Sequence, residues 1–476
     1  MKRSKSSVRN YASGAVKTIV LTVAVSAAAL RIAVPAGAET LRLTLEEAIG
    51  LGIKNSSTVQ SKGIAIASAK AATAATKAAR YPSLDLTATW SRLWEQPSPV
   101  TLFVPDPANP GDTTPVSLGY QVAQNPLVFS FDLNQPIYTF GKIKNSVLKN
   151  EKGVEAAEME LKEETRKLAV EISRAFYGYL LAKEAVNINE ETLKFKQETL
   201  DAARKKYDAG IVSDFDVLQA ESDMIGFQPQ LISSRNQVRF ALLAVMDLLN
   251  VKAEEGEGFD IDLIGELKPE YHTLDKEDIM KKALDNKYEV QSFKKGMEVA
   301  ELQTKLVRSA NKPTFSAFGN YTIQSQYDPV SGEDVYWGEG AWRDDFTFGA
   351  VAQVPLSALF PWSKERADKT KDQLDYEQLK LSLTTIESGV RLNIENLLLK
   401  LEEEKSKIAS MEKSVELMSR LYRTTRERFG LGLVSNIELR DAEMNLNGAQ
   451  LGRIQAIYSY TVTFISLLDA VGVDSL

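Results

Sequence analysis

The stretch YDAGIVSDFDVLQAE, Tyr207–Glu221, returns 222 positions later as FGLGLVSNIELRDAE, Phe429–Glu443. Each copy holds a glycine, Gly210 or Gly432, that can take the left-handed conformation closing a helix. A serine that can cap the next helix follows, with a carboxylate three residues later to complete a capping box: Ser213 with Asp216, and Ser435 with Glu438. Residues 207–214 and 429–436 are therefore predicted to be tight tips of antiparallel helical hairpins.

The repeat extends well beyond the tips, from 142 to 251 and again from 364 to 473. Apolar residues recur every seven positions in the outgoing segments, at Ile172, Tyr179, Val186, Leu193, Leu200 and Tyr207, and at Ile394, Leu401, Ile408, Val415, Tyr422 and Phe429. A second seam runs through Leu161, Leu168 and Ala175, matched by Leu383, Val390 and Leu397. These seams predict coiled-coil helices at about 142–206 and 364–428, each about 95 Å long at about 1.5 Å per residue. The return helices, about 214–250 and 436–472, are roughly half as long.

A second layer of repetition relates residues 43–84 to residues 274–315. Each copy predicts a helix, at about 44–80 and about 275–311, broken near Asn55 and Asn286 and ended by Pro82 and Pro313. Stacked end to end, such a helix and a return helix nearly match the length of one long rod. The chain is thus a tandem duplication: a first repeat at 39–251, a linker or equatorial segment at 252–273, and a second repeat at 274–476.

Two candidate strands separate the short and long helices of each repeat. They lie at about 83–94 and 126–138 in the first repeat, and at about 314–327 and 344–356 in the second. Apolar and polar side chains alternate along them, which is typical of strands that span lipid in a β-barrel. All 5 tryptophans fall in or beside these segments, as expected of an interfacial aromatic belt. A soluble sheet with one buried face would give the same alternation.

Four strands are too few to close a barrel, and open sheet edges are prohibitive in lipid. Membrane strands therefore predict an oligomer in which several chains share one barrel. The proline-rich stretch 97–125 is predicted to be an irregular external loop, and 328–343 a shorter loop. The acidic segment 251–273 can add a short strand outside the rods.

Residues 1–38 carry basic residues, an apolar run from Ile19 to Leu30 and then Ala36-Gly37-Ala38, which predicts a secretory signal peptide cleaved before Glu39. Its loss removes six basic residues and no acidic one, so the formal charge falls from -7 to -13, which argues against a nucleic-acid partner. Beyond this segment no run of about 18 uncharged apolar residues occurs, so no transmembrane helix is expected.

With no cysteine and a single histidine, His272, in a polar stretch, the sequence offers no thiolate chemistry and no metal or cofactor site. No phosphate-binding glycine motif is present, and scattered helical carboxylates are usually a solvated face. We therefore expect no enzymatic activity and no cofactor.

The complete order, helix, two strands, long helix and tip, in duplicate after a signal peptide, resembles the TolC-type outer-membrane efflux protein family from Leu43 to Val473. The resemblance implies an α+β membrane protein: a homotrimer whose pooled strands form one outer-membrane β-barrel, continued into the periplasm by an α-helical barrel. It implies an exit duct for efflux or type I secretion, which passes small molecules or proteins from an inner-membrane pump through a periplasmic adaptor. Outer-membrane lipid would be a further partner.

The same resemblance assigns the candidate sites. Acidic side chains just past the tips constrict the periplasmic entrance in this family, and the matching residues are Asp216, Glu438 and Asp441. Asp216 and Glu438 can equally serve only as helix caps, whereas Asp441 has no cap to make. The implied adaptor contacts are the tip residues Gly210, Ile211, Val212, Ser213, Gly432, Leu433, Val434 and Ser435. Val434 stands where some members carry a basic residue for an inter-helix latch, which leaves any latch here unassigned.

A different class of function stays open at this point. A periplasmic coiled-coil scaffold or adhesin without a pore would share the signal peptide and the rods, and its sheet would be soluble. Such a protein should fractionate as soluble and form no heat-labile oligomer in detergent.

Overall fold

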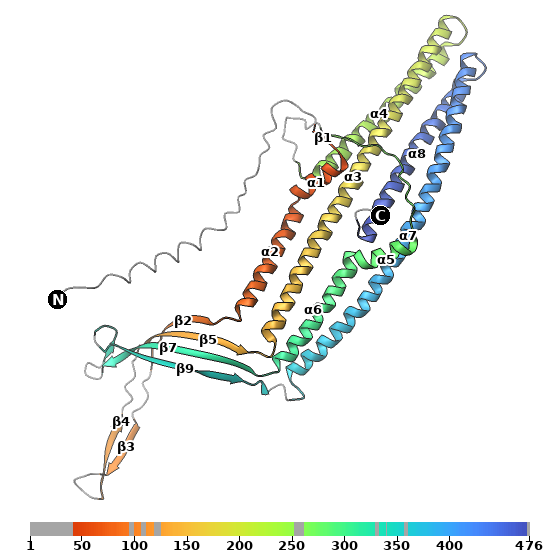
Figure 1. Ribbon diagram of the computed structural model, residues 1–476. Coiled ribbons are helices and arrows are strands. Elements are labelled where there is room, and N and C mark those ends of the chain that lie inside the picture. The colour runs from red at the N-terminus through yellow and green to blue at the C-terminus, as the bar shows by residue number, and fades with distance from the viewer. Residues whose placement is uncertain are drawn as a thin grey trace, which may run out of the picture. The chain divides into compact units, whose positions relative to one another are not determined.

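The computed structural model describes residues 41–94, 100–105, 111–118, 125–251, 261–328, 333–338, 340–356 and 360–473 (Figure 1). The signal peptide predicted for residues 1–38 lies outside the described residues. The chain divides into two units, Met1–Arg42 with Ala253–Asp262, and Leu43–Lys252 with Leu263–Leu476. Where they meet in sequence, the short strands β1 (Leu41–Leu43) and β6 (Ile261–Leu263) pair. The acidic linker thus supplies one short strand.

Two helical hairpins dominate the larger unit. The long helices α3 (Lys142–Asp208) and α7 (Lys364–Gly430) each have 67 residues, and the return helices α4 (Asp214–Leu248) and α8 (Asn436–Val471) have 35 and 36. The heptad seams explain why the long helices pack against their neighbours: Ile172 in α3 and its counterpart Ile394 in α7 are both fully buried. Pro229 lies inside α4 without ending that helix.

The short helices are broken close to where the sequence predicts it. In the first repeat α1 (Leu45–Asn55) is followed by α2 (Ser57–Ala78), and in the second α5 (Lys276–Asn286) is followed by α6 (Tyr288–Ala310). Each break meets the end of a return helix. The Asn55 side chain donates to the carbonyl of Leu249 at 3.2 Å, and the Asn250 side chain donates to the carbonyl of Asn55 at 3.1 Å. These bonds join the end of α4 to the α1–α2 break, so the return helix and the short helix of the first repeat are stacked end to end.

At the second break Gly472 occupies the position that Asn250 occupies at the first. Both residues have positive φ, 78° and 51°, and Gly472 follows the end of α8. A Cβ on Gly472 would lie 2.9 Å from the carbonyl oxygen of Asn286. Only glycine allows the end of α8 to approach the α5–α6 break this closely.

Four antiparallel strands form the main sheet in the order β2 (Ser83–Trp90), β5 (Leu127–Tyr138), β7 (Thr314–Asp328) and β9 (Trp342–Gln353). Their register aligns side chains of one kind in rows across all four strands. One face carries the rows Leu86, Phe131, Tyr321, Phe346 and Leu84, Leu133, Gly319, Phe348. The other carries the rows Asp85, Asp132, Asn320, Thr347 and Thr87, Ser130, Thr322, Asp345. The two repeats therefore build one wall with an apolar and a polar face.

The prediction of irregular loops between the strands was wrong in two places. Within 97–125, the strands β3 (Val100–Pro105) and β4 (Thr113–Leu118) form a separate two-stranded ribbon. Pro115 sits opposite Phe103 in that ribbon, which is possible because each strand has a free edge where a missing N–H costs nothing. Within 328–343, the short strand β8 (Glu333–Val335) pairs with the end of β7.

The helices of the larger unit pack in a fixed order. At the level of the return helices the order is α4, α3, α8, α7, and nearer the sheet it is α2, α3, α6, α7 (Figure 1). The first-repeat helices α2 and α4 thus lie at one edge and α7 lies at the other. Among the described helices, α8 is long and apolar enough to cross a membrane by length and composition. Its packing on α7 and α3 accounts for that composition, because residues such as Ile457 and Leu467 are buried there.

Candidate functional site: the hairpin tips

The two tips have the same backbone. Gly210 and Gly432 adopt φ values of 75° and 74°, the left-handed conformation expected for a helix end. At the second tip the Ser435 amide and hydroxyl donate to the Glu438 carboxylate, and the Glu438 amide donates back to the Ser435 hydroxyl at 3.3 Å. At the first tip the Ser213 amide and hydroxyl both donate to the Asp216 carboxylate, at 3.0 and 2.8 Å. The predicted caps are therefore formed in both repeats.

The three acidic gate candidates differ in how their charges are engaged. Asp216 on α4 and Glu438 on α8 bind their cap serines. The Asp441 side chain is 60% exposed, and its carboxylate lies 3.8 Å from Nε of the neighbouring Arg440. No three acidic or histidine side chains gather into a metal-binding group in the described parts of the chain. Any ring of these carboxylates would have to come from several copies.

The tips expose large apolar side chains. Ile211, Phe215, Leu431 and Leu433 are each more than three-fifths exposed. Val212 and Val434 are partly buried, and Gly210 and Gly432, two residues before them, are exposed. A contiguous apolar end on a soluble rod commonly marks a protein contact.

Contacts between the two hairpins, which sequence reasoning left unassigned, lie close to the tips. Lys206 of the first hairpin donates to the Phe429 carbonyl of the second, and its Nζ lies 4.1 Å from the centre of the Phe429 ring. Arg426 and Glu198 form an ion pair at 2.6 Å. The Arg440 guanidinium, on α8, lies 3.6 Å from the Asp223 carboxylate on α4. These contacts, rather than a basic residue at position 434, join the hairpins at this end.

A buried polar seam continues the contact away from the tips. Its members are Asn189, Thr192 and Lys196 on α3, facing Glu443 and Asn447 on α8. The Asn447 side chain donates to the Thr192 hydroxyl at 2.8 Å. Lys196 Nζ lies 3.1 Å from Glu443 and 5.4 Å from the centre of the Phe227 ring. Burial raises the pKa of Glu443, and the charge of Lys196 opposes that shift.

The sequence did carry a signal for this seam. The second heptad seam, followed beyond Ala175 in steps of seven, reaches Asn189 and then Lys196, where apolar residues would be expected. Polar residues at core heptad positions weaken packing and fix register or partner. The interruption marks where α3 leaves an apolar core for contacts with the second hairpin.

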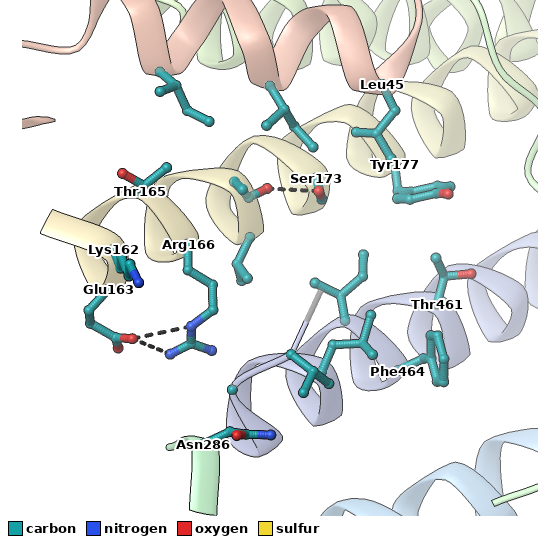
Figure 2. A pocket seen from close by; sticks show the side chains of 18 of the residues that line it. Leu45, Lys162, Glu163, Thr165, Arg166, Ser173, Tyr177, Asn286, Thr461 and Phe464 are labelled. Atoms are coloured by element: carbon teal, nitrogen blue, oxygen red, sulfur yellow. Dashed lines mark hydrogen bonds and ion pairs between the residues drawn. The ribbon is translucent and has the colours of Figure 1, made fainter. Parts of the chain in front are cut away.

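A large cavity of about 1210 Å³ lies farther along the rods, lined by α1, α3, the residues after β6, the α5–α6 break and the end of α8. Figure 2 shows Arg166 on its wall, bonded to Glu163. Arg166 also pairs with Asp469 at 2.8 Å, and Lys287 donates to the Asp469 carbonyl at 3.1 Å. Because α8 has no basic residue in its last turn, these two cations, from α3 and from the α5–α6 break, offset the negative end of its dipole. The cluster stabilises the junction between the end of α8 and the α5–α6 break.

Comparison with known proteins gives a consistent result over most of the chain. A model of the family described as Outer membrane efflux protein matches residues 48–251 and 279–473. A curated relative, the probable efflux pump outer membrane protein TtgC of Pseudomonas putida, is 21% identical over 312 residues. That match covers 64% of this chain and 60% of the relative. The aligned part therefore spans less than two thirds of TtgC.

Solved structures resemble the fold over a longer stretch. The CmeC outer membrane channel of Campylobacter jejuni superposes with a TM-score of 0.67 at 17% identity, over 90% of this chain and 85% of CmeC. The outer membrane protein VceC of Vibrio cholerae gives a TM-score of 0.67 at 16% identity, over 90% of this chain and 96% of VceC. The chain has the same fold as these proteins.

Proposed function

Because this chain belongs to the outer membrane efflux protein family, we propose that it is an outer-membrane exit duct, assembled from three copies and serving an inner-membrane pump. The observation that carries the proposal is that the single chain is an incomplete wall. Its sheet and its helical layer both end in unpartnered edges, on the same two sides. Membership in the family places the chain in the outer membrane.

The edge helices supply the first support. Leu218, Ile225 and Ile232 recur every seven residues on α4 and are each more than half exposed. On the opposite edge, α7 exposes Leu374 and Leu381, and farther along Leu392 and Leu399, again seven residues apart. Seven-residue apolar stripes are coiled-coil contacts that lack a partner within the chain. The α4 edge of one copy would pack on the α7 edge of the next.

The sheet edges support the same arrangement. Among the described strands, β2 pairs only with β5, and β9 pairs only with β7. With four antiparallel strands, β9 of one copy runs opposite to β2 of the next, so the ladder can continue around a ring. Three copies would supply twelve strands, within the range of about 8 to 26 seen in closed membrane barrels. The contact is head to tail and closes as a ring.

The two faces of the sheet suit a barrel wall. The rows with Phe131 and Phe346 would face lipid, and the rows with Asp132 and Asn320 would face the lumen. The Asn320 side chain donates to Asp132 at 2.6 Å and to the Ser130 hydroxyl at 2.9 Å, so the polar face is already hydrogen-bonded. A wet lumen of this kind passes cargo without any catalytic group.

At the periplasmic mouth, Asp216, Glu438 and Asp441 are the proposed gate. Threefold repetition would turn each into a ring of negative charge, which favours cations in a pore. The capping bonds of Asp216 and Glu438 leave Asp441 as the freest of the three. No enzymatic step is part of this proposal.

The exposed tips are the proposed docking surface for a periplasmic adaptor. The turns at Gly210–Ser213 and Gly432–Ser435 present apolar side chains that suit tip-to-tip packing of helical hairpins. Gly432→Trp should abolish export of a reporter substrate while leaving the assembled protein in the outer membrane. Loss of the assembly itself in this variant would show that the tip has only a structural role.

The duct can be tested with the purified protein. Extracted from outer membranes and added to planar lipid bilayers, it should insert in steps and conduct ions. Recovery as a soluble periplasmic protein that never conducts would instead favour the coiled-coil scaffold or adhesin.

A further inference from the structure

The four places where a strand meets a helix lie at one end of the sheet. Ser83, the first residue of β2, sits opposite Asn134 near the end of β5, and Thr314, the first of β7, sits opposite Gln353, the last of β9. Each junction carries an exposed cation next to the strand end, and these are Arg80, Lys142, Lys312 and Lys364. We call these four the collar cations.

Two collar cations stand where a cation is locally unfavourable. Lys142 and Lys364 are the first residues of α3 and α7, the two 67-residue helices. The positive end of a helix dipole repels a cation and attracts an anion. The first turn of α3 holds no acidic residue to compensate, whereas the first turn of α7 holds Glu365. At the start of α3, helix stability therefore does not explain the lysine.

The collar cations lack a carboxylate partner in the part of the chain that the structure describes. None of the four forms an ion pair within the described ranges, although many other lysines and arginines of the helices do. Lys312 makes an aromatic contact, with its Nζ 5.5 Å from the centre of the Phe140 ring. Gln135 at the end of β5 donates to the Arg80 carbonyl at 3.0 Å, which fixes the backbone but leaves the guanidinium free.

Aromatic side chains surround the same junctions. Tyr81, Tyr138 and Trp362 are 72%, 54% and 81% exposed, and Trp362 stacks on Phe360 at 5.2 Å. Trp90, Trp94 and Trp342 lie toward the other end of the sheet. Between these levels β9 has 12 residues, about 40 Å at about 3.3 Å each, and a strand tilt of about 40° reduces its height to about 30 Å, comparable with the apolar band of about 25 Å in outer-membrane barrels. The junction therefore lies at one membrane–water interface.

We propose that the collar cations bind the phosphate groups of anionic phospholipids in the periplasmic leaflet. The long helices leave the sheet at this end, so the junction faces the periplasm. The lipid-facing rows lead directly to it, the aromatic side chains set its depth, and the free cations supply the complementary charge. The proposal rests on the proposed barrel in the outer membrane and not on the proposed export.

The test compares two matched variants. In the collar variant, Arg80, Lys142, Lys312 and Lys364 are each replaced by Gln. In the control variant, four exposed helix cations without a described ion pair, Lys194, Lys400, Arg423 and Arg453, are replaced by Gln. Each protein is reconstituted into nanodiscs with equal amounts of phosphatidylglycerol and phosphatidylethanolamine and then extracted, and the retained lipid is measured by mass spectrometry.

The wild type and the control variant should retain phosphatidylglycerol over phosphatidylethanolamine by about threefold or more, and the collar variant should show nearly equal retention. Unheated gel mobility checks that each assembly is intact. If the collar variant does not assemble, the pair Lys142→Gln and Lys364→Gln should lose about half of the preference on its own. No preference in the wild type, or the same loss in the control variant, would overturn the proposal.

Discussion

Lys196 Nζ lies 3.1 Å from the Glu443 carboxylate, and both side chains are more than nine-tenths buried where α3 of the first repeat meets α8 of the second. Their counterparts in the repeat are Met418 and Glu221, so the pair breaks the internal symmetry of the chain. The pair therefore belongs to the contact between the two hairpins and not to the packing within either hairpin.

Removing one partner of this pair should be costly. Lys196→Met leaves a buried carboxylate without its cation, and we expect the free energy of unfolding to fall by about 3 kcal/mol. Replacing both, by Lys196→Met with Glu443→Leu, should restore most of that loss. Denaturant unfolding of the assembled protein measures both effects. Glu416→Gln, at the exposed pair with Lys413, should cost less than about 1 kcal/mol. Equal losses of unfolding free energy at the two pairs would contradict the claim that burial makes the Lys196–Glu443 pair costly to break.

Glu443 also predicts a pH dependence. Burial raises its pKa in the folded protein above the ordinary value of 4.5. Between these two pKa values the folded state binds more protons than the unfolded state, so this group's contribution to stability falls as pH rises. The stability of the wild type relative to Glu443→Gln should therefore decrease as pH rises from 4.5 through the folded pKa. Thermal unfolding of both proteins across this range tests it, and a difference that does not change with pH would refute it.

Gly472 should tolerate no side chain. Gly472→Ala places a Cβ 2.9 Å from the Asn286 carbonyl at a residue with a φ of 78°. We expect a loss of about 2 kcal/mol or more, seen as a lower thermal midpoint. Gly448→Ala, in α8 with nothing within 4 Å of its Cβ, is the matched control and should be neutral or slightly stabilising. A neutral Gly472→Ala would mean that the end of α8 can move away from the α5–α6 break.

The proposed gate predicts a change in conductance. Asp441→Asn combined with Glu438→Gln removes both charges while the glutamine keeps an acceptor for Ser435. We expect higher conductance and weaker block by divalent cations in planar bilayers, because the negative rings would be neutralised. Asp375→Asn, on the exposed surface of α7, should change neither property. Unchanged block in the double variant would remove the gate assignment.

The periodic features of this fold could be predicted from the sequence because they repeat. The 222-residue offset marked α3 and α7 as one element written twice, and Gly210 and Gly432 marked their ends. The four sheet strands followed from alternation. The proline content of residues 97–125 wrongly predicted an irregular loop. The ribbon β3–β4 forms there in spite of its prolines, because its strand edges are free.

Side-chain partners across the two repeats could not be predicted in this way. Lys206 with Phe429, and Asp223 with Arg440, join residues more than 200 positions apart, and no periodicity relates them. Only the polar interruption at Asn189 and Lys196 hinted that the hairpins meet there. The gate and adaptor residues remain predictions from family resemblance and position.

One chain is an incomplete wall, and we propose that copies of the same chain complete it. The most direct test is the mass of the protein extracted from outer membranes in mild detergent, measured by light scattering with the detergent contribution subtracted. We predict three times the mass of the mature chain. A single-copy mass, from protein that fractionates with the aqueous periplasm, would contradict it.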